Sequence, residues 1–502
     1  MWNEERPFAE GVAALAYCNP FLPRRVELER AALGSDFEAH GETWNPIAGS
    51  ISSPNVAKIQ DRLGARIPVW RDRLLTGSTT KPGDLALYRD VVYYALYNHY
   101  AEELLELIKA EGSTVRMPNW ATFLEDLETF LPAEIEVQGR VPPDLLLAWF
   151  FQLRRAFHHI FRSIYGSSLP VAELRAQVWQ SVFTHDMRRY QSGLYERMRE
   201  TTTLITGPSG TGKELVARGI ALSQYIPFDS RRKVFKADFR DAFRALNLSA
   251  LSPTLIESEL FGHRKGAFTG ALDDRRGWLE ACPAHGTVFL DEIGDVSEEI
   301  QVKLLRVLQT RAFQRLGDTE DRSFEGKLVA ATNREPEAEM EAGRMRTDFY
   351  YRICADQVRT PSLQQQLDRS GKELTLLLQV IVSDLVGPEN AESLTHEVAD
   401  WVVTHLGHDY PWPGNFRELE QCARNVMIRG SYRPAHPATL TPTLASEISE
   451  LSLDAETLLR RYATLAYHRT GSYVGAADKI GLDRRTIKAK VDPEYLAALR
   501  SA

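Results

Sequence analysis

The chain has 502 residues, with 60 Lys and Arg against 68 Asp and Glu, a formal net charge of −8. Hydrophobic residues make up 43% and charged residues 25%, which excludes a wholly disordered chain and a uniformly cationic nucleic-acid coat. At about 150 residues per domain, this length predicts several domains. The four cysteines lie far apart without a CxxC pair, which fits a reducing cytosol. Without a signal peptide or a long apolar run, we expect a soluble, cytoplasmic protein with no membrane partner.

The first third of the chain, residues 1–175, is predicted to be a helical domain. Apolar residues recur at helical spacing over Asp84–Gly112, where Asp84 is a candidate cap, and over residues 144–165. The region lacks the acidic pair, strand-end aspartate and late lysine of a phosphorylated receiver domain. His158 and His159 have no third ligand at metal spacing, so we interpret them as ordinary surface or buried histidines. The ligand or partner of this domain is not identified by any motif.

From about residue 179 the chain alternates short apolar strands with helices, as in α/β nucleotide-binding proteins. LITGPSGTGKE (Leu204–Glu214) is a strand, a glycine-rich turn and a helix start, where backbone N–H groups and the helix dipole would bind phosphate. Lys213 would reach the β- and γ-phosphates. Glu214 stands where Ser or Thr usually supplies a magnesium ligand, so the metal must depend on other residues or on water. The predicted ATP-binding residues here are Gly207, Pro208, Ser209, Gly210, Thr211, Gly212, Lys213 and Glu214.

A second motif, GTVFLDEIGDV, places two carboxylates at the end of a short apolar strand. The strand is predicted over Thr287–Leu290, and α/β folds bind ligands at the carboxyl ends of their strands. Asp291 is expected to hold Mg²⁺, directly or through water, and Glu292 to orient and polarise the attacking water. An isolated Asp-Glu pair is common in solvated turns. Downstream of a phosphate loop, the pair predicts ATP hydrolysis.

Between these motifs lies ESELFGHRKGAFTGA (Glu257–Ala271). With it, the chain resembles the bacterial enhancer-binding proteins, the AAA+ ATPases that activate sigma-54 RNA polymerase, from about Trp179 to the C-terminus. The resemblance implies an AAA+ α/β core over residues 176–360 and a helical lid over residues 361–432. It also implies a mobile loop that touches sigma-54, with Phe268 and Thr269 lifted to its tip. The implied contact residues are Gly266, Ala267, Phe268, Thr269, Gly270 and Ala271.

The same resemblance assigns further residues around the nucleotide in a hexameric ring. By this resemblance, Asn247 restrains the catalytic glutamate, and Thr332 and Asn333 sense the γ-phosphate. Arg346 and Arg352 complete the nucleotide site of the neighbouring subunit, and Arg417 is the sensor II arginine. Two segments depart from the family pattern. Tyr225–Leu246 is longer and more charged than usual, and PSLQQQLDRSGK (Pro361–Lys372) replaces a proline- and arginine-rich pattern.

The end of the chain is locally basic. Residues 456–502 hold nine Lys and Arg against five Asp and Glu, a local charge of +4, after a proline-containing linker at 433–455. GSYVGAADKIGLDRRTIKAKV (Gly471–Val491) resembles a Fis-type helix-turn-helix, in which Asp483 can cap the recognition helix. Val474 stands where the family has Ser or Thr, so we expect the preceding helix to lack its cap. The predicted DNA-binding residues are Arg484, Arg485, Thr486 and Lys488.

Three functional interpretations follow from these motifs. The first is an activator that binds upstream DNA, hydrolyses ATP between subunits and remodels the sigma-54 polymerase, with the first domain restraining or licensing ring assembly. The second is a DNA-binding regulator of the same fold that works without sigma-54, although such relatives lose the GAFTGA loop that is intact here. The third is a general AAA+ remodeller, against which the basic helix-turn-helix argues. An oligomerisation hairpin is the alternative interpretation of the C-terminal helices.

Overall fold

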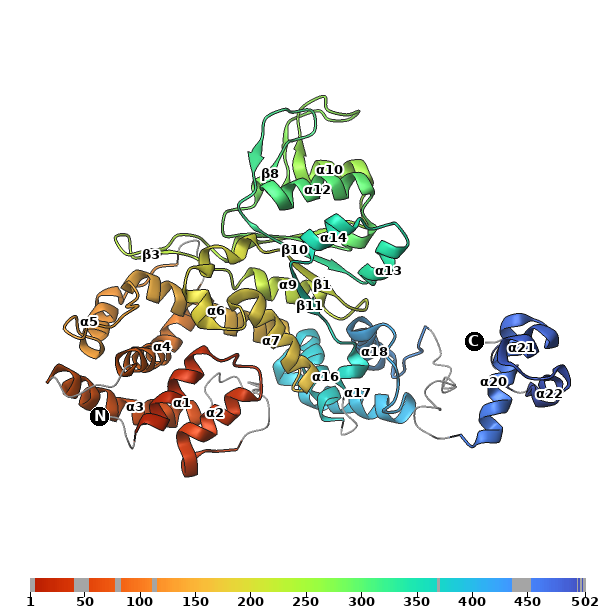
Figure 1. Ribbon diagram of the computed structural model, residues 1–502, viewed down its shortest axis with the longest axis horizontal. Helices are drawn as coiled ribbons and strands as arrows, with labels where there is room; N and C mark the ends of the chain where they lie inside the picture. Colours follow the sequence, from red (N-terminus) through yellow and green to blue (C-terminus); the bar gives the residue numbers. More distant parts are fainter. Residues whose placement is uncertain are drawn as a thin grey trace. The chain divides into compact units, whose positions relative to one another are not determined.

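The computed structural model describes residues 5–39, 54–76, 83–110, 115–367, 371–435 and 453–493, with 495, 496 and 499 (Figure 1). It divides into two compact units, residues 1–430 and 431–502. The first unit contains a helical region, a parallel α/β sheet and a further set of helices, and the second unit is helical. The predicted fold class is therefore confirmed. Among the described residues, no helix is long and apolar enough to cross a membrane.

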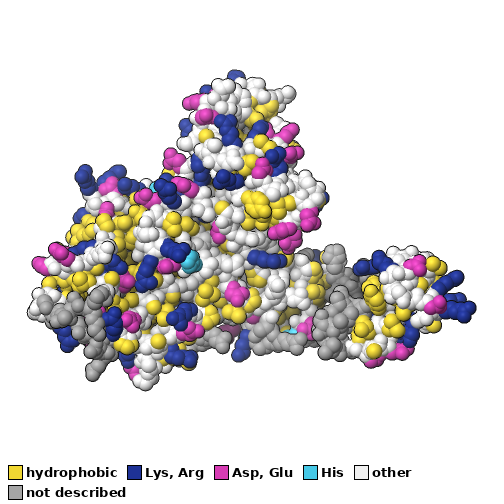
Figure 2. Space-filling view, in the orientation of Figure 1, with side chains coloured by type: hydrophobic (Ala, Val, Ile, Leu, Met, Phe, Trp, Pro, Cys, Tyr) yellow, Lys and Arg dark blue, Asp and Glu magenta, His cyan; other side chains and the backbone are white. Residues whose placement is uncertain are grey.

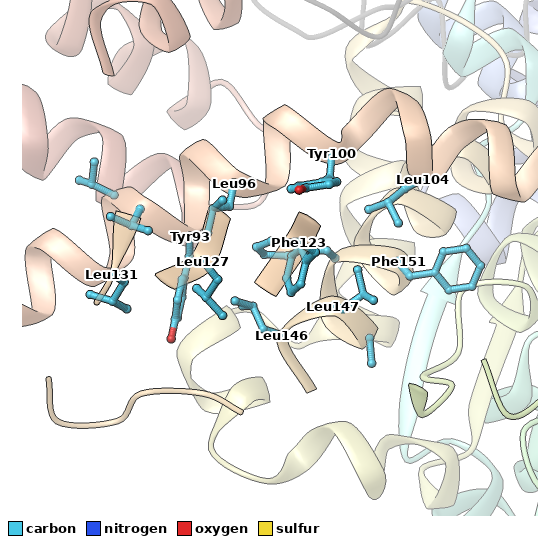
Figure 3. Close-up of a cluster of buried hydrophobic side chains, with 14 of the residues drawn as sticks. Tyr93, Leu96, Tyr100, Leu104, Phe123, Leu127, Leu131, Leu146, Leu147 and Phe151 are labelled. Carbon is cyan, nitrogen blue, oxygen red and sulfur yellow. The ribbon is translucent and has the colours of Figure 1, made fainter. Parts of the chain in front are cut away.

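The helical region begins the first unit. Its helices are α1 (Arg6–Tyr17), α2 (Arg24–Leu33), α3 (Pro54–Leu75), α4 (Asp84–Lys109), α5 (Trp120–Phe130), α6 (Pro143–Ser163), α7 (Leu169–Phe183) and α8 (Met187–Gln191). Figure 3 shows the centre of its core, where Tyr100 and Phe123 lie against each other between α4 and α5, with ring centroids 5.3 Å apart. Leu146, Leu147 and Phe151 of α6 complete this cluster. The region thus has a hydrophobic core of its own.

The two helices predicted from apolar spacing appear as α4 and α6, but the expected cap of α4 is wrong. The N-cap residue is Gly83, which makes no side-chain cap. Asp84 is instead 1% exposed and ion-paired with Arg6, 2.7 Å away. A buried carboxylate is stable only with such a partner, so Asp84 ties α4 to α1.

The α/β region is built on a five-stranded, wholly parallel sheet in the order β11-β1-β10-β7-β4. Its strands are β4 (Phe243–Asn247), β7 (Thr287–Asp291), β1 (Thr203–Thr206), β10 (Lys327–Thr332) and β11 (Asp356–Arg359). The three central strands β1, β10 and β7 are short and almost wholly buried, as the covering of both faces of a parallel sheet requires. The edge strands β4 and β11 are partly exposed. In register, Thr206 lies beside Thr332 and Asn247 beside Asp291. The carboxyl ends of four strands therefore meet at one edge.

Helices and short hairpins complete this region. The helices are α9 (Lys213–Ala221), α10 (Pro253–Phe261), α11 (Trp278–Ala281), α12 (Glu298–Thr310), α13 (Pro336–Glu341) and α14 (Thr347–Ile353). The hairpins pair β2 (Phe228–Asp229) with β3 (Val234–Phe235), β5 (Gly262–His263) with β6 (Arg275–Arg276), and β8 (Ala312–Phe313) with β9 (Arg322–Ser323).

The long segment Tyr225–Leu246 belongs structurally to the helical region. Its β2–β3 hairpin is extended by residues 115–117, because Phe235 N donates to Val115 O and Met117 N donates to Lys233 O. Phe235 stacks on Phe151 of α6 with centroids 3.9 Å apart. Phe228 and Phe235 of the inserted segment are thus part of the hydrophobic core of the helical region.

The boundary expected after residue 175 falls inside α7, a continuous helix from Leu169 to Phe183. Its aromatic side chains share a core with the sheet: Trp179 and Phe183 cluster with Ile205 of β1 and Val358 of β11. The helical region and the α/β region thus have no exposed linker between them along this stretch.

The lid follows β11 and consists of α15 (Leu363–Gln366), α16 (Lys372–Val386), α17 (Ala391–His405) and α18 (Asn415–Arg429). Within the altered Pro361–Lys372 segment, Ser362 and Gln365 form a capping box that starts α15. Residues 368–370 of that segment lie outside the described residues, as does most of the predicted 433–455 linker.

The second unit contains α20 (Ala455–Thr470), α21 (Tyr473–Ile480) and α22 (Arg484–Lys490) around a small core that includes Ala476 and Ile487. The expected loss of a cap at Val474 is wrong. Ser472 is the N-cap of α21, and its hydroxyl accepts from Gly475 N at 3.0 Å. The helix starts two positions earlier than the comparison with the family motif implies.

Candidate functional site

The phosphate loop leaves β1 at Thr206 and enters α9 at Lys213. Gly207, Gly210 and Gly212 all have positive φ, which a side chain would disfavour. Gly207 and Gly210 also pack so closely against Thr360 and Gly414 that a Cβ atom on either would clash. The loop is held by Thr211, whose hydroxyl donates to Pro208 O at 2.8 Å and lies 2.7 Å from the Thr360 hydroxyl. Thr360 follows β11 and was not predicted.

Lys213 is buried at the start of α9, with its ammonium 3.0 Å from Gly207 O and 3.2 Å from Pro208 O. Burial lowers the pKa of this ammonium, while the nearby carboxylates of Glu292 and Asp291 partly restore it. The Lys213 ammonium therefore lies against the phosphate loop, where it can bind an anionic group. Glu214 beside it is exposed.

The two carboxylates lie at the carboxyl end of the sheet, as predicted. Asp291 ends β7, and Glu292 follows in a left-handed backbone conformation with φ of 55°. Asp291 Oδ1 accepts from Glu292 N at 3.1 Å. Glu292 Oε2 accepts from Asn333 N at 3.3 Å, which links the acidic pair to the end of β10. Thr332 is buried at that strand end and accepts from Arg334 N through its hydroxyl.

The lid reaches the phosphate loop through three consecutive residues at the start of α18. Asn415 Nδ2 donates to Ser209 O at 2.9 Å, and Phe416 N donates to Gly210 O at 3.0 Å. Arg417 Nη1 donates to Ser209 Oγ at 3.2 Å. Asn415 Oδ1 also accepts from Leu363 N at 2.8 Å, so one amide joins the loop to both α15 and α18. Only Arg417 was predicted; the left-handed Asn415, with φ of 51°, carries no sequence signal beyond its place after glycine.

Most of these groups line one cavity of about 540 Å³, whereas Thr332, Asn333 and Asn415 are not among its lining residues. Its wall includes Ser209–Val216 of the loop and α9, Asp291 and Glu292 of the sheet edge, and Arg417 and Arg424 of the lid. Cations from the loop and lid face carboxylates from β7 across this space. Such an arrangement suits a polyphosphate bound together with a divalent cation.

Carboxylate oxygens are the ligands that Mg²⁺ prefers, and Asp291 and Glu292 are both only partly buried on the cavity wall. The donor set therefore fits this metal. Asn247 lies beside Asp291 in the sheet register, but its side chain accepts from Ser249 N at 3.0 Å and from the Ser249 hydroxyl at 2.8 Å. Among the described residues, no hydrogen bond joins Asn247 to Glu292, so the implied restraint is not formed in this conformation.

Arg346 and Arg352 lie on the surface of the α/β region, at and within α14. Arg346 is ion-paired with Glu298 and Asp348, each 2.9 Å away, and these pairs raise the pKa of its guanidinium. Arg352 is exposed and makes no ion pair within the described part of the chain. Neither arginine lines the nucleotide cavity of its own subunit.

The GAFTGA loop lies at the end of the β5–β6 hairpin. Gly266 and Gly270 have φ of 82° and 101°, and Gly266 N donates to Ala271 O at 2.9 Å, which closes a tight turn. Thr269 is exposed, but Phe268 is half-buried and packs edge-on against His263, with ring centroids 5.0 Å apart. The expectation that both side chains stand at the tip is thus wrong for Phe268, because the ring finds an aromatic partner at the hairpin base.

The recognition-helix candidate α22 is capped as predicted, since Asp483 Oδ1 accepts from Arg485 N at 2.7 Å. Ile487 is fully buried, whereas Arg484, Arg485 and Lys488 are exposed. Thr486 is half-buried. Figure 2 shows Lys and Arg side chains on the surface of this unit.

The sheet order, the phosphate loop and the acidic strand end together define a P-loop nucleotide-binding protein of the AAA+ type. Residues 184–359 match the family described as the Sigma-54 interaction domain. The predicted relationship to sigma-54-dependent activators is thereby confirmed for this segment.

Three curated relatives extend this match. The chain is 37% identical over 301 residues to the transcriptional regulatory protein ZraR of Escherichia coli O157:H7, covering 58% of this chain and 63% of that protein. It is 37% identical over 301 residues to the Nif-specific regulatory protein of Azotobacter vinelandii, covering 58% of this chain and 54% of that protein. It is 43% identical over 229 residues to the hydrogenase transcriptional regulatory protein HoxA of Bradyrhizobium diazoefficiens, covering 46% and 43%. The chain thus spans between 43% and 63% of the lengths of these three relatives.

Among solved structures, NtrX from Brucella abortus matches with a TM-score of 0.39 and 22% sequence identity, over 76% of this chain and 80% of that one. A likeness this weak supports no assignment.

Proposed function

We propose that this protein is an ATP-dependent transcriptional activator, which binds upstream DNA and remodels the closed complex of sigma-54 RNA polymerase. One observation carries the proposal: the phosphate loop, the acidic strand end and the lid arginine line a single cavity within a chain that also carries a Sigma-54 interaction domain. A protein that acts at bacterial promoters would be located in the cytoplasm, in association with the nucleoid.

In this proposal, Lys213 and the glycine-rich backbone bind the β- and γ-phosphates of ATP. Mg²⁺ held by Asp291 would neutralise charge on the phosphates. Glu292 orients the attacking water, and its hydrogen bond from Asn333 N fixes the carboxylate at the end of β10. Thr332 and Asn333 sense the γ-phosphate. Arg417, which already contacts Ser209, reports nucleotide state to the lid.

The ring and its targets complete the proposal. Arg346 and Arg352 act on the nucleotide of the neighbouring subunit in a hexamer, since neither reaches its own. The loop Gly266–Ala271 touches sigma-54, and Asn247 couples the nucleotide to that loop in a conformation other than this one. The helix α22 reads DNA through Arg484, Arg485, Thr486 and Lys488.

Replacement of the proposed water-positioning residue tests the ATPase step. The Glu292→Gln variant should bind ATP as the wild type does and lose at least about 100-fold in turnover, because an amide cannot polarise the water. The matched control is Glu299→Gln, which changes an exposed glutamate of α12. Undiminished turnover in Glu292→Gln, measured as phosphate release, would remove the assigned role.

A further inference from the structure

The helical region contains a second cavity of about 300 Å³, lined by residues of α1, α2, α3, α4, α6, α7 and α8. It shares no lining residue with the nucleotide cavity. About a third of its lining residues are aromatic, including Tyr94, Tyr97, Trp149, Phe150, Phe157 and Trp179, and most of the others are apolar. A space of this size admits a small organic molecule, and an apolar space left empty is destabilising.

The charged groups on the cavity wall are offset by carboxylates. Arg25 is paired with Glu29 at 2.7 Å, and Arg154 lies 3.4 Å from Glu102. A charged ligand would therefore find no charged side chain on this wall that is free to neutralise it. Aromatic walls with neutralised charges favour an uncharged ring system.

Two lining residues carry buried polar nitrogens without a hydrogen-bond partner among the described residues: the Gln60 amide nitrogen and the indole nitrogen of Trp149. Trp149 is 6% exposed, and an indole N–H can only donate. Buried donors are normally paired, so these two favour a ligand that supplies an acceptor oxygen or nitrogen.

The helix α6 connects this cavity to the nucleotide site. Trp149 and Phe157 face the cavity, whereas Gln152 and Arg155 bind the C-terminal end of α9, the helix that begins at Lys213. Gln152 Nε2 donates to Ser223 O at 3.0 Å, and Arg155 donates to Leu222 O at 2.8 Å and to Gln224 O at 2.5 Å. One helix is thus in contact with both sites.

We propose that this cavity binds a small uncharged aromatic molecule bearing a hydrogen-bond acceptor, and that α6 transmits its occupancy to the phosphate-loop helix. The second clause rests on the proposed nucleotide site, and the first does not.

Binding is tested with 6-propionyl-2-dimethylaminonaphthalene, an uncharged naphthalene ketone whose fluorescence shifts to the blue in apolar surroundings. The full-length protein should bind it saturably, one molecule per chain. Ala101→Phe places a ring into the cavity from α4 and should weaken binding by at least about tenfold. Ala121→Phe makes the same change at an exposed position of α5 and should leave binding unchanged.

The Gln60→Leu variant tests whether a hydrogen bond, and not only apolar contact, contributes to binding. This variant should weaken binding of the ketone but not of the hydrocarbon 2-ethylnaphthalene, measured by competition. Absence of saturable binding to the wild type, or equal affinity in Ala101→Phe and Ala121→Phe, would overturn the binding site.

Transmission is tested by the affinity for a fluorescent ATP analogue, with and without saturating ketone. Occupancy should change that affinity by about threefold or more in the wild type. In Gln152→Leu, which loses the contact to Ser223 O, the ketone should still bind while the change in nucleotide affinity disappears. A wild type that binds both molecules independently would overturn transmission, whereas a failure to bind nucleotide at all would instead contradict the proposed function.

Discussion

At the scale of single residues, the two arginines proposed to act on the neighbouring subunit's nucleotide, Arg346 and Arg352, differ in their ion pairing. Arg346 is engaged by Glu298 and Asp348 of its own chain, and must leave both to reach a neighbouring nucleotide. Arg352 is exposed, with no ion pair found among the described residues. Surface ion pairs contribute little free energy, so the two ion pairs of Arg346 can be broken at small cost when it contacts a neighbouring nucleotide.

Mixing two inactive variants tests whether Arg352 acts between subunits. Arg352→Ala should retain ATP binding and lose about 10³-fold in turnover, because the transferring phosphoryl group loses a cation. Mixed with Glu292→Gln subunits, it should recover part of the activity. In mixed rings, some seams pair an intact Glu292 with an intact Arg352.

The control is Arg359→Ala, which changes an arginine that is also exposed and is not assigned to the nucleotide. Phosphate release that stays at the level of the separate variants after mixing would count against action in trans.

His158 and His159, adjacent on α6, make the fold sensitive to acid. Burial lowers the pKa of His158 to about 4, helped by the charges of Arg162 and Arg154, and it lowers that of His159 well below the ordinary value. The unfolded chain takes up a proton at His158 below about pH 6.5, and the folded chain does not until near pH 4. Stability is therefore present above pH 6.5 and falls as the pH drops toward 4.

Replacing His158 by Gln should remove part of this pH dependence. We expect the wild type to lose about 1–2 kcal/mol more than His158→Gln between pH 7 and pH 5, after allowance for its partial exposure. Urea unfolding at the two pH values measures the difference. A variant whose loss equals that of the wild type would show that His158 titrates normally in the fold.

At the scale of elements, the hairpin β2–β3 anchors the chain segment that precedes β4 in the helical region. Phe235 is 3% exposed and stacks on Phe151, and its backbone N–H pairs with Val115 O. The neighbouring Phe228 packs against Trp120 with centroids 4.9 Å apart. The hairpin is therefore an insertion in the nucleotide-binding fold that packs against the helical region.

Truncating the hairpin's aromatic anchor should be costly. Phe235→Ala leaves a cavity beside Phe151, and we expect a loss of about 3–5 kcal/mol in the free energy of unfolding of the first unit. Tyr351→Ala removes an aromatic ring that is 70% exposed, and it should change stability by less than about 0.5 kcal/mol. Urea midpoints compare the two. Similar small losses in both would show that the hairpin does not anchor the region.

The sequence predicts elements well where the signal is local. The phosphate loop, the strand that ends in Asp291 and the capped helix after Asp483 all depend on residues next to one another in the chain. The use of Tyr225–Leu246 was not predictable, because its partners lie at residues 115–117 and on α6, far away in sequence. Thr360 and Asn415 were missed for the same reason: their contacts with the phosphate loop arise only on folding.

At the scale of the whole molecule, the structure changes the expected relation between the helical region and the ATPase. The region was expected to be a separate domain ending near residue 175, but α7 continues across that position and shares a core with β1 and β11. Gln152 and Arg155 of α6 hold the end of α9 directly. The transmission proposed above therefore has a direct route, because α6 already contacts the end of the phosphate-loop helix.

The central claim is that ATP turnover in this chain opens sigma-54 promoters through the exposed loop. The most direct measurement is open-complex formation by purified protein, sigma-54 polymerase and supercoiled promoter DNA, with ATP and with a saturating ligand of the helical region if one is required. We expect the wild type to open the promoter, and Thr269→Ala to hydrolyse ATP normally without opening it. Promoter opening by Thr269→Ala equal to that of the wild type, or a wild type that hydrolyses ATP and never opens the promoter, would contradict the account.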